Sequence, residues 1–570
     1  MQNHSGATTG SRPMAAVWLH GPIRDLAFGC GLFSLAMMLA LAVFGGATVQ
    51  SWFPVGAMVL LFSLPHYGAT LLRVYEERED RAKYFFFAVP VTLVMVVVFV
   101  LGVEWTYFGS LVLTLYLTWS PWHYTGQNYG IMAMLLGRAG IPLANWRRRI
   151  LRLSFSSSYV LTFLAMHGSE RAANYTPVPY QGSLYSLIPI GIPESIADPA
   201  IALAAVVWFS STAAAMYLAL RAAGREKRRA IPALLLLLTQ SLWFVIPAIL
   251  RRLDIATASP EFASVFTAYG FLWIAAAHAL QYLWITSYYD GKAHPERASG
   301  TGRAGYFARA ALCGYAIWVL PAVLLAPGYL GRLSAEAGLS LMVAAVVNLH
   351  HFILDGAVWK LRDKRVATTL IASAPPPQPV TEPEASVPRM RPAQRWLAPL
   401  IYSLGALALS INLLTSTVDS WAFRRNLNGG DLSAASRATQ IMTHLGAASA
   451  SRRIELANAY ARNGGTREAQ RHFKESLRIH ETAEGWRGLG LLSERKRDWE
   501  AALDAYDRAL LLKENDVAAL YRSGQVLMWM NEPERAVDRL ERAVGLSPKQ
   551  KSISTALRRA QLQAATDDTH

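Results

Sequence analysis

The sequence predicts an all-α protein: a polytopic membrane helix bundle of ten or eleven spans, followed by a C-terminal α-helical repeat domain. Three observations support this fold class. Of the 570 residues, 53% are hydrophobic and 16% are charged, and 17 are tryptophans. Most of the apolar residues fall in long runs, and a membrane helix needs about 20 such residues. After about residue 430 the composition changes to Ala, Arg, Glu and Leu with a helical period.

The apolar runs define eleven candidate spans, preceded by a polar N-terminal segment, residues 1–24. The first ten belong to a membrane core, 25–365, and a Pro-rich linker, 366–394, separates this core from the eleventh. The expected spans are 25–47, 51–73, 84–103, 105–135, 151–167, 198–222, 230–250, 261–289, 304–330, 338–361 and 396–416.

Basic residues account for the net charge of +16 and lie mainly in alternate loops, after spans two, four, six, eight and ten. This pattern is typical of membrane topology and gives no reason to expect nucleic-acid binding. We therefore expect a multi-pass protein of the bacterial inner membrane with a cytoplasmic N-terminus. Eleven spans then place the repeat domain outside the cytoplasm, and one missed span would reverse that side.

Four of the spans carry histidines in the membrane interior, where an ionisable residue is a functional hypothesis by default. His66, His123, His278 and His351 lie on spans two, four, eight and ten, which all run from outside to inside. Each lies in the half of its span nearer the basic loop. Histidine is the commonest metal ligand. Matched depth on parallel helices therefore predicts one metal site in the inner leaflet, with the adjacent His350 as a further candidate ligand.

Polar residues three or four positions later share the helix faces of three of these histidines. A metal-bound histidine normally donates its second ring nitrogen to such a partner. We expect these residues to orient the ligands or to act in catalysis. They are Gln127 beside His123, Gln281 and Tyr282 beside His278, and Asp355 beside His351. Adjacent histidines point about 100° apart on a helix, so His350 and His351 would serve two ions, or one ion and a relay.

Imidazoles with carboxylate or amide oxygens suit iron, zinc, copper or manganese. The two cysteines, Cys30 and Cys313, argue against a thiolate site and a disulfide scaffold. Substrates reached from a bilayer are hydrophobic, and activation of oxygen by non-haem iron is chemistry that such molecules need. The sequence thus favours a non-haem iron oxygenase acting on a hydrophobic small molecule. Two alternatives stay open: a bis-histidine haem b electron-transfer protein, and a transporter that uses the histidines as a proton relay.

The segment Pro65-His66-Tyr67-Gly68 and the histidine–aspartate helix around His351 resemble the bacterial membrane β-carotene 15,15′-dioxygenase family. This resemblance covers the ten-span core and implies iron and the cleavage of a carotenoid. The His350-His351 pair, the glutamine partners, the extra spans and the repeat tail depart from the family's pattern. The histidine boxes of fatty-acid desaturases are absent from the sequence.

The C-terminal region contains an internal repeat with steps of 33 and 34 residues, seen at Ala469, Ala502 and Ala536. The same steps separate the aromatic or apolar residues Phe473, Tyr506 and Leu540. The pattern resembles the tetratricopeptide repeat over roughly 450–549; the first unit departs from it, with Ala457 at the usual glycine position. Such repeats bind protein or peptide partners. We expect domain 430–570 to recruit a protein, the alternative being a helical cap without a ligand.

The sequence also predicts the surroundings of four tryptophans and of the remaining histidines. The tryptophans near the histidines either line a substrate cavity or pack in the core: Trp119, Trp122, Trp273 and Trp284. The remaining histidines are expected at the surface or at interfaces: His20, His167, His294, His444, His472 and His480.

Overall fold

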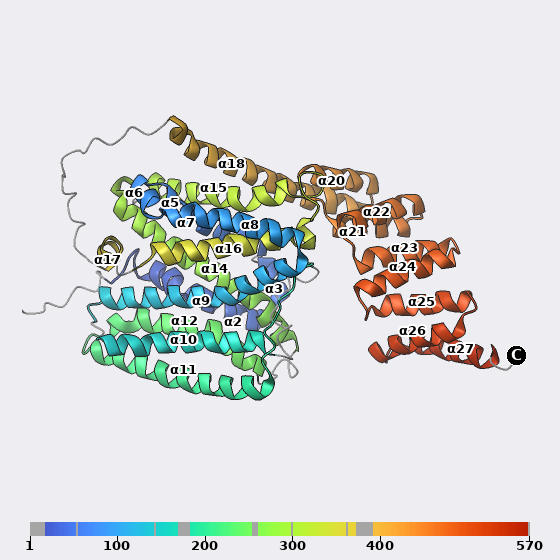
Figure 1. The fold of residues 1–570 in the computed structure, drawn as a ribbon, viewed down its shortest axis with the longest axis horizontal. Coiled ribbons are helices and arrows are strands. Elements are labelled where there is room, and N and C mark those ends of the chain that lie inside the picture. Colours follow the sequence, from blue (N-terminus) through green and yellow to red (C-terminus); the bar gives the residue numbers. More distant parts are fainter. Residues whose placement is uncertain are drawn as a thin grey trace, which may run out of the picture. The chain divides into compact units, whose positions relative to one another are not determined.

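The structure is a computed structural model, and it describes residues 17–52, 55–141, 144–168, 183–252, 260–297, 300–360, 363–371 and 392–567. Within these ranges the regular elements are helices, with two isolated β-bridges, Gly168–Ile192 and Pro327–Gly331 (Figure 1). The all-α prediction is therefore confirmed for the described chain. The contacts divide the chain into two units: unit 1 comprises 1–320 and 341–409, and unit 2 comprises 321–340 and 410–570.

Unit 1 is a bundle of helices, many of them long, and a helix lies in each of the eleven predicted spans. The segment before Leu32 bends by 59° against the following helix, and π-helical turns interrupt the chain at 25–29 and 59–63. The helices are α1 (Pro22–Arg24), α2 (Leu32–Phe44), α3 (Gly46–Trp52), α4 (Val55–Met58), α5 (Leu64–Tyr75), α6 (Arg78–Lys83), α7 (Phe85–Ala88), α8 (Pro90–Glu104), α9 (Thr106–Arg138), α10 (Asn145–His167), α11 (Glu194–Ala222), α12 (Ile231–Arg252), α14 (Pro260–Ala293), α15 (Gly300–Leu324), α16 (Ser340–Val358), α17 (Lys364–Ile371) and α18 (Pro392–Thr417).

Six helices of the described chain are long and apolar enough to cross a membrane, or seven if the bent pair at the N-terminal end counts as one span. The predicted number of ten or eleven is higher. The difference lies at the segments around α5, α9, α10 and α14, three of which carry the histidines. Many polar side chains on the described parts of these segments are buried within the bundle.

Two glycines allow α5 and α15 to cross at very short range. A Cβ added at Gly68 would lie 1.7 Å from the carbonyl oxygen of Ala310, and one added at Gly314 would lie 1.8 Å from that of Leu64. Real side chains cannot approach a backbone so closely, so this crossing requires glycine at both positions. The crossing holds the first turns of α5, and with them His66, against the rest of the bundle.

The start of the predicted linker, 366–394, is helical in the structure, which corrects that prediction. Residues 364–371 form α17, an amphipathic helix whose Val366 and Leu370 are buried. The buried Arg138 donates a hydrogen bond of 3.0 Å to the carbonyl of Leu370. Burial of this apolar face explains why the segment is ordered as a helix. The Pro-rich remainder, 372–391, lies outside the described residues.

Unit 2 consists of short helices stacked in pairs, as the repeat pattern predicts. Its helices are α19 (Arg425–Gly429), α20 (Leu432–His444), α21 (Ala450–Arg462), α22 (Thr466–Ile479), α23 (Ala483–Arg495), α24 (Trp499–Leu512), α25 (Val517–Trp529), α26 (Pro533–Leu546) and α27 (Lys551–Asp567). Within a pair, small residues face large ones: a Cβ at Gly490 would meet Tyr506 at 2.6 Å, and one at Gly524 would meet Leu540 at 2.7 Å. The repeating alanines Ala469, Ala502 and Ala536 are fully buried.

Candidate metal centre

Four helices of unit 1 bring four imidazoles into one cluster. His66 lies on α5, His123 on α9, His278 on α14 and His351 on α16. The ring centroids of His66 and His351 are 4.2 Å apart, and those of His123 and His278 are 5.0 Å apart. The other close pairs are separated by 5.0–6.1 Å. The structure thus places the four predicted ligands together.

The hydrogen bonds of His66 determine which of its nitrogens carries the proton. Its Nδ1 lies 3.2 Å from the carbonyl oxygen of Ser63, which can only accept. A neutral imidazole has one donor nitrogen and one acceptor nitrogen. His66 therefore carries its proton on Nδ1, and its Nε2 presents a lone pair to the cluster.

A chain of hydroxyl groups assigns the proton of His351 in the same way. The Nδ1 of His351 lies 2.8 Å from Thr70 Oγ1, and Thr70 donates to the Tyr282 hydroxyl at 2.7 Å. Tyr282 in turn donates to Asp355 Oδ1 at 2.8 Å. Thr70 has one hydroxyl proton, and Tyr282, Asp355 Oδ1 and His351 Nδ1 all lie within hydrogen-bond range of its oxygen. When that proton goes to Tyr282, the Nδ1–H of His351 is the donor to Thr70. Its Nε2 is then also an acceptor.

The two acceptor nitrogens face each other across a short gap. His66 Nε2 and His351 Nε2 are 2.8 Å apart, and both residues are buried. With both protons on Nδ1, two lone pairs at this range repel unless a cation lies between them; with the His351 proton on Nε2, the same contact is a hydrogen bond to His66 Nε2. Two nitrogens bound to one ion at about 2.0–2.1 Å each would be separated by roughly 3 Å or slightly more. A small outward movement of the rings would therefore accommodate a metal ion.

The remaining two histidines have ring nitrogens without a hydrogen-bond partner among the described residues. These are Nε2 of His123 and both Nδ1 and Nε2 of His278. Buried polar atoms are nearly always hydrogen-bonded, so each exception needs an explanation. Metal coordination is one such explanation, because an imidazole ligand uses its lone pair on the ion.

Two overlapping sets of ligand atoms have metal-binding spacing. One set is His66, His278 and His351, and the other is His123, His351 and Asp355. Within each set the candidate atoms lie within 4.8 Å of one another. Asp355 Oδ2 is 3.3 Å from His351 Nε2 and 3.7 Å from His123 Nε2, while its Oδ1 accepts from Tyr282. One carboxylate oxygen is thus held by a hydroxyl and the other faces the imidazoles.

The structure does not bring His350 into the cluster. Its Nε2 lies 2.9 Å from Thr92 Oγ1 on α8. Consecutive residues of a helix point about 100° apart, and His351 occupies the face toward the cluster. The inclusion of His350 among the ligands is therefore corrected.

The two predicted glutamines lie beside the cluster and bond mainly to each other and to backbone. Gln127 donates to Gln281 Oε1 at 3.1 Å and to the carbonyl of His278 at 3.4 Å. Gln281 donates to the carbonyl of Gly29 at 3.2 Å. These bonds fix the backbone of α14 at His278. They position that histidine without contacting its ring.

Sequence reasoning missed Thr70 and Trp359. Thr70 lies four residues after His66 and hence on the same helix face, which is the signal that would have found it. Trp359 donates from its indole Nε1 to the Tyr282 hydroxyl at 3.0 Å. It follows the last residue of α16, and nothing in its sequence position distinguishes it from a tryptophan at a membrane interface.

A cavity of about 370 Å³ reaches the cluster from the side of α9. Its polar lining residues are His123, Gln127, Tyr282 and Asp355. The apolar and glycine lining residues are Trp119, Trp122, Gly126, Gly130, Ile131, Met134, Ile285, Phe352, Gly356, Trp359, Val366 and Leu370. Of the four tryptophans considered from sequence, Trp119 and Trp122 line this cavity, whereas Trp273 and Trp284 are buried in the core.

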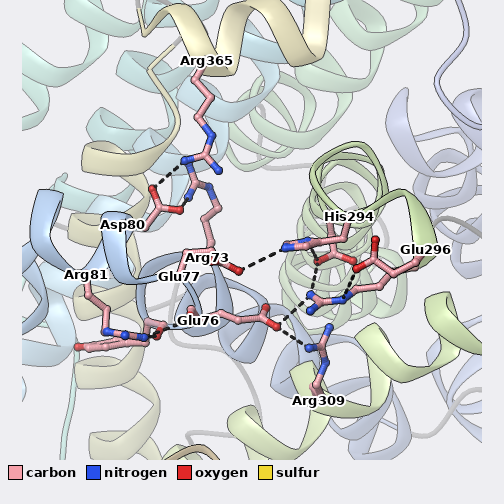
Figure 2. Close-up of polar contacts among 12 residues, drawn as sticks. Arg73, Glu76, Glu77, Asp80, Arg81, His294, Glu296, Arg309 and Arg365 are labelled. Carbon is pink, nitrogen blue, oxygen red and sulfur yellow. Dashed lines mark hydrogen bonds and ion pairs between the residues drawn. The ribbon is translucent and has the colours of Figure 1, made fainter. Parts of the chain in front are cut away.

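A network of ion pairs joins the ends of α5, α6, α14, α15 and α17 near the cluster (Figure 2). Asp80 pairs with Arg73 and, at 3.5 Å, with Arg365. Glu76 pairs with Arg309 and, at 3.0 Å, with Arg297. These contacts hold α17 against α6 and thereby fix one wall of the cavity.

The other histidines differ in their surroundings. His167 and His472 are buried, which contradicts the expected surface or interface position. His167 lies 2.9 Å from Thr118 Oγ1, and His20 lies 3.0 Å from the carbonyl of Trp284. His472 in α22 contacts Arg453 at 3.2 Å. Burial lowers the pKa of His472 to about 4, Glu475 opposes this shift, and nearby arginines reinforce it.

Comparison with known proteins bears on the repeats. No protein-family model matches the chain. The anaphase-promoting complex subunit 3 of Schizosaccharomyces pombe is 27% identical over 99 residues, which are 17% of this chain and 15% of that protein. The chain therefore spans only a small part of that relative's length. The crystal structure of MamA protein matches with 22% identity and a TM-score of 0.25, over 27% of this chain and 85% of that one.

The C-terminal region is a helical repeat domain, and its repeats fit the tetratricopeptide pattern. The helix pairs of unit 2 and the sequence likeness to the fission-yeast subunit agree on this point. The comparisons give no support to the resemblance between the membrane core and the β-carotene dioxygenase family.

Proposed function

We propose that this chain is a membrane protein whose helix bundle binds a transition-metal ion beside a hydrophobic substrate cavity. His66, His278 and His351 are the proposed ligands of one ion. His123 and Asp355 complete its surroundings or hold a second ion. The repeats of unit 2 recruit a protein partner, since stacked repeats of this type present binding surfaces to proteins.

The main support for the metal site is the short distance between the Nε2 atoms of His66 and His351. The tautomers with both protons on Nδ1 leave these two atoms as acceptors 2.8 Å apart. Protonating one ring would place a charge in a buried site, which is costly. A metal ion satisfies both nitrogens and also supplies a partner for the rings of His123 and His278.

For the reaction, we propose that the ion is iron and that it activates dioxygen toward a hydrophobic substrate. Nitrogen and carboxylate ligands suit iron, and equally zinc, copper or manganese. The cavity supports the substrate class, because indole rings, Phe352 and aliphatic side chains make most of its wall. Carotenoid cleavage, implied by the resemblance of the segment around His66, is one reaction of this kind.

The packing of the cluster favours a bare ion over haem. An axial histidine pair holds a porphyrin plane between its rings. Here the four imidazoles contact one another, with centroids 4.2–6.1 Å apart, and Tyr124 stacks on His278 at 4.1 Å. This arrangement is compact enough for an ion and too compact for a macrocycle.

A proton relay is the second alternative, and the hydroxyl chain from His351 to Asp355 favours it. At Tyr282 this row of hydroxyl groups ends at Trp359, whose indole N–H donates to Tyr282 but cannot accept a proton in return. A proton therefore cannot pass beyond Tyr282 through Trp359. This break favours a network that orients metal ligands over one that conducts protons through the bundle.

We also propose the bacterial inner membrane as the location, with the N-terminus in the cytoplasm and the repeats outside it. The alternation of basic loops supports this orientation. The exposed side of α8 supports bilayer contact, because Leu93, Val94, Val97 and Val100 are each more than half exposed. Such an apolar surface is unusual for a helix that faces water.

The test is a comparison of metal content in the detergent-purified wild-type protein, His351→Ala and His350→Ala. We expect wild type and His350→Ala to contain at least one equivalent of metal by elemental analysis, and His351→Ala to lose most of it. The two substitutions remove adjacent imidazoles from one helix, so His350→Ala controls for the loss of a histidine side chain from α16.

Equal metal content in all three proteins would contradict the site. A Soret band in the absorption spectrum would replace it with a haem site. Absence of metal from a wild-type protein purified with added iron, zinc, copper or manganese would favour the proton relay.

A further inference from the structure

The cavity beside the cluster is elongated along α9. Its wall on α9 runs from Trp119 to Met134, and fifteen helical residues correspond to about 22 Å. The volume of about 370 Å³ is small for that length. An extended chain follows a wall of that length, whereas a compact ring system spans only part of it.

Two glycines on α9 widen this cavity, which we call the trough. Gly126 and Gly130 both line it, and a Cβ added at either position has no neighbour within 4 Å. Trp122, one turn earlier, is 48% exposed. The trough is therefore open along the outer side of the bundle, where the bilayer would lie in a membrane protein.

The ends of the trough differ in chemistry. At one end Phe352 stacks on His123 with ring centroids 4.3 Å apart, and the carboxylate of Asp355 lies close by. At the other end Val366 and Leu370 of α17 form an apolar wall. His123 lies four residues from Trp119 and eleven from Met134, or about 6 Å and about 17 Å along the helix. A molecule that fills the trough would therefore contact the histidine cluster near one end of that molecule.

We propose that the trough binds a single linear hydrocarbon chain, the tail of a lipid that enters sideways from the bilayer. The chain lies along α9 over Gly126 and Gly130, and the part near one end reaches His123 and Asp355. This inference names the substrate class of the metal centre and thus rests on the proposed function. It restricts that class to linear chains and places the reacting carbons near a chain end.

A second copy of this protein is the rival occupant, because Gly126 and Gly130 have the spacing at which membrane helices pack closely. Two features argue against it. The side chain of Trp122 protrudes one turn before Gly126 and would hold a second helix away. The cavity also extends inward past the glycines to Tyr282 and Asp355, deeper than the side of a docked helix reaches.

The test uses the full-length protein in detergent and cis-parinaric acid, a linear fluorescent fatty acid. Binding is measured as energy transfer from tryptophan to the probe. The signal should saturate with probe concentration, and oleate should displace the probe. We expect Gly126→Leu and Gly130→Leu to weaken binding by roughly ten-fold or more, because leucine fills the trough. Gly305→Leu is the matched control, since Gly305 is an exposed helical glycine whose added Cβ also meets nothing within 4 Å. Dehydroergosterol, a fluorescent fused-ring sterol, should bind roughly ten-fold or more weakly than the linear probe.

Metal content is measured on the same samples, so failure of the metal-site proposal can be told apart from failure of the lipid-binding proposal. Linear-chain binding that depends on Gly126 and Gly130 supports this inference even if no metal is found. Equal affinity of the glycine variants and wild type would overturn it, and so would a sterol that binds as tightly as the linear probe. If Gly126→Leu instead converts a dimer to a monomer in light scattering, the occupant is a second copy and the inference is wrong.

Discussion

At the scale of single residues, the centre depends on where each histidine places its proton. In the proposed metal-binding state, Ser63 and Thr70 accept the Nδ1 protons of His66 and His351, and both Nε2 atoms present lone pairs to the cluster. The sequence predicted the four converging histidines and Asp355 from helix spacing and matched depth. The spacing places Thr70 on the helix face of His66 but does not give its role, because a threonine in an apolar helix normally bonds to its own backbone. The contact that distinguishes this one comes from two other helices.

Replacement of Thr70 by valine tests this proton assignment. Thr70→Val keeps the shape but removes the acceptor for His351 Nδ1–H and the link to Tyr282. We expect metal affinity to fall roughly 10- to 100-fold, as is typical when the outer partner of a ligand is lost, measured by chelator competition. Thr92→Val is the control, because Thr92 contacts His350 outside the cluster. Equal affinities of the two variants would show that Thr70 does not position the ligand.

At the scale of elements, two features position the site: the glycine crossing of α5 with α15, and the short helix α17. A helix lies in each predicted span, but only six or seven segments of the described chain are long and apolar enough to cross a membrane. The π-helical turns and the helical start of the linker were not predictable in this way. Each depends on contacts with helices distant in sequence, such as the bond from Arg138 to the carbonyl of Leu370.

The crossing leads to a prediction about Gly314. Gly314→Ala places a Cβ 1.8 Å from the carbonyl oxygen of Leu64, so α5 and α15 must move apart. We expect a loss of about 1–3 kcal/mol in stability, typical of overpacking, seen as a lower melting temperature in detergent. Metal content should fall with it, because α5 carries His66. Gly305→Ala, on the same helix in open space, should melt like wild type or slightly higher. A Gly314→Ala protein with wild-type melting and metal content would mean that the crossing does not position the site.

At the scale of the whole molecule, the chain combines two units with different sources of stability. Unit 1 has an apolar exterior and a polar centre, whereas unit 2 stacks amphipathic helix pairs around small residues. The repeat unit was predictable because its spacing recurs in the sequence. The chemistry inside unit 1 was predictable only in outline, since a single chain of hydroxyl and ring contacts decides which histidines can bind an ion.

Unit 2 should lose stability in acid because of His472. Burial lowers the pKa of His472 to about 4 in the folded state, against an ordinary value near 6.5 in the unfolded chain. Between these two values the unfolded state binds more protons, so stability is complete above about pH 6.5 and falls as the pH drops toward 4. The loss should be on the order of 1–3 kcal/mol. Hydrogen exchange of α20–α22 in the full-length protein measures it. His472→Gln should flatten this pH dependence, whereas His444→Gln, at an exposed position, should leave it unchanged. Identical profiles for the two variants would show that His472 does not control the acid response of the repeats.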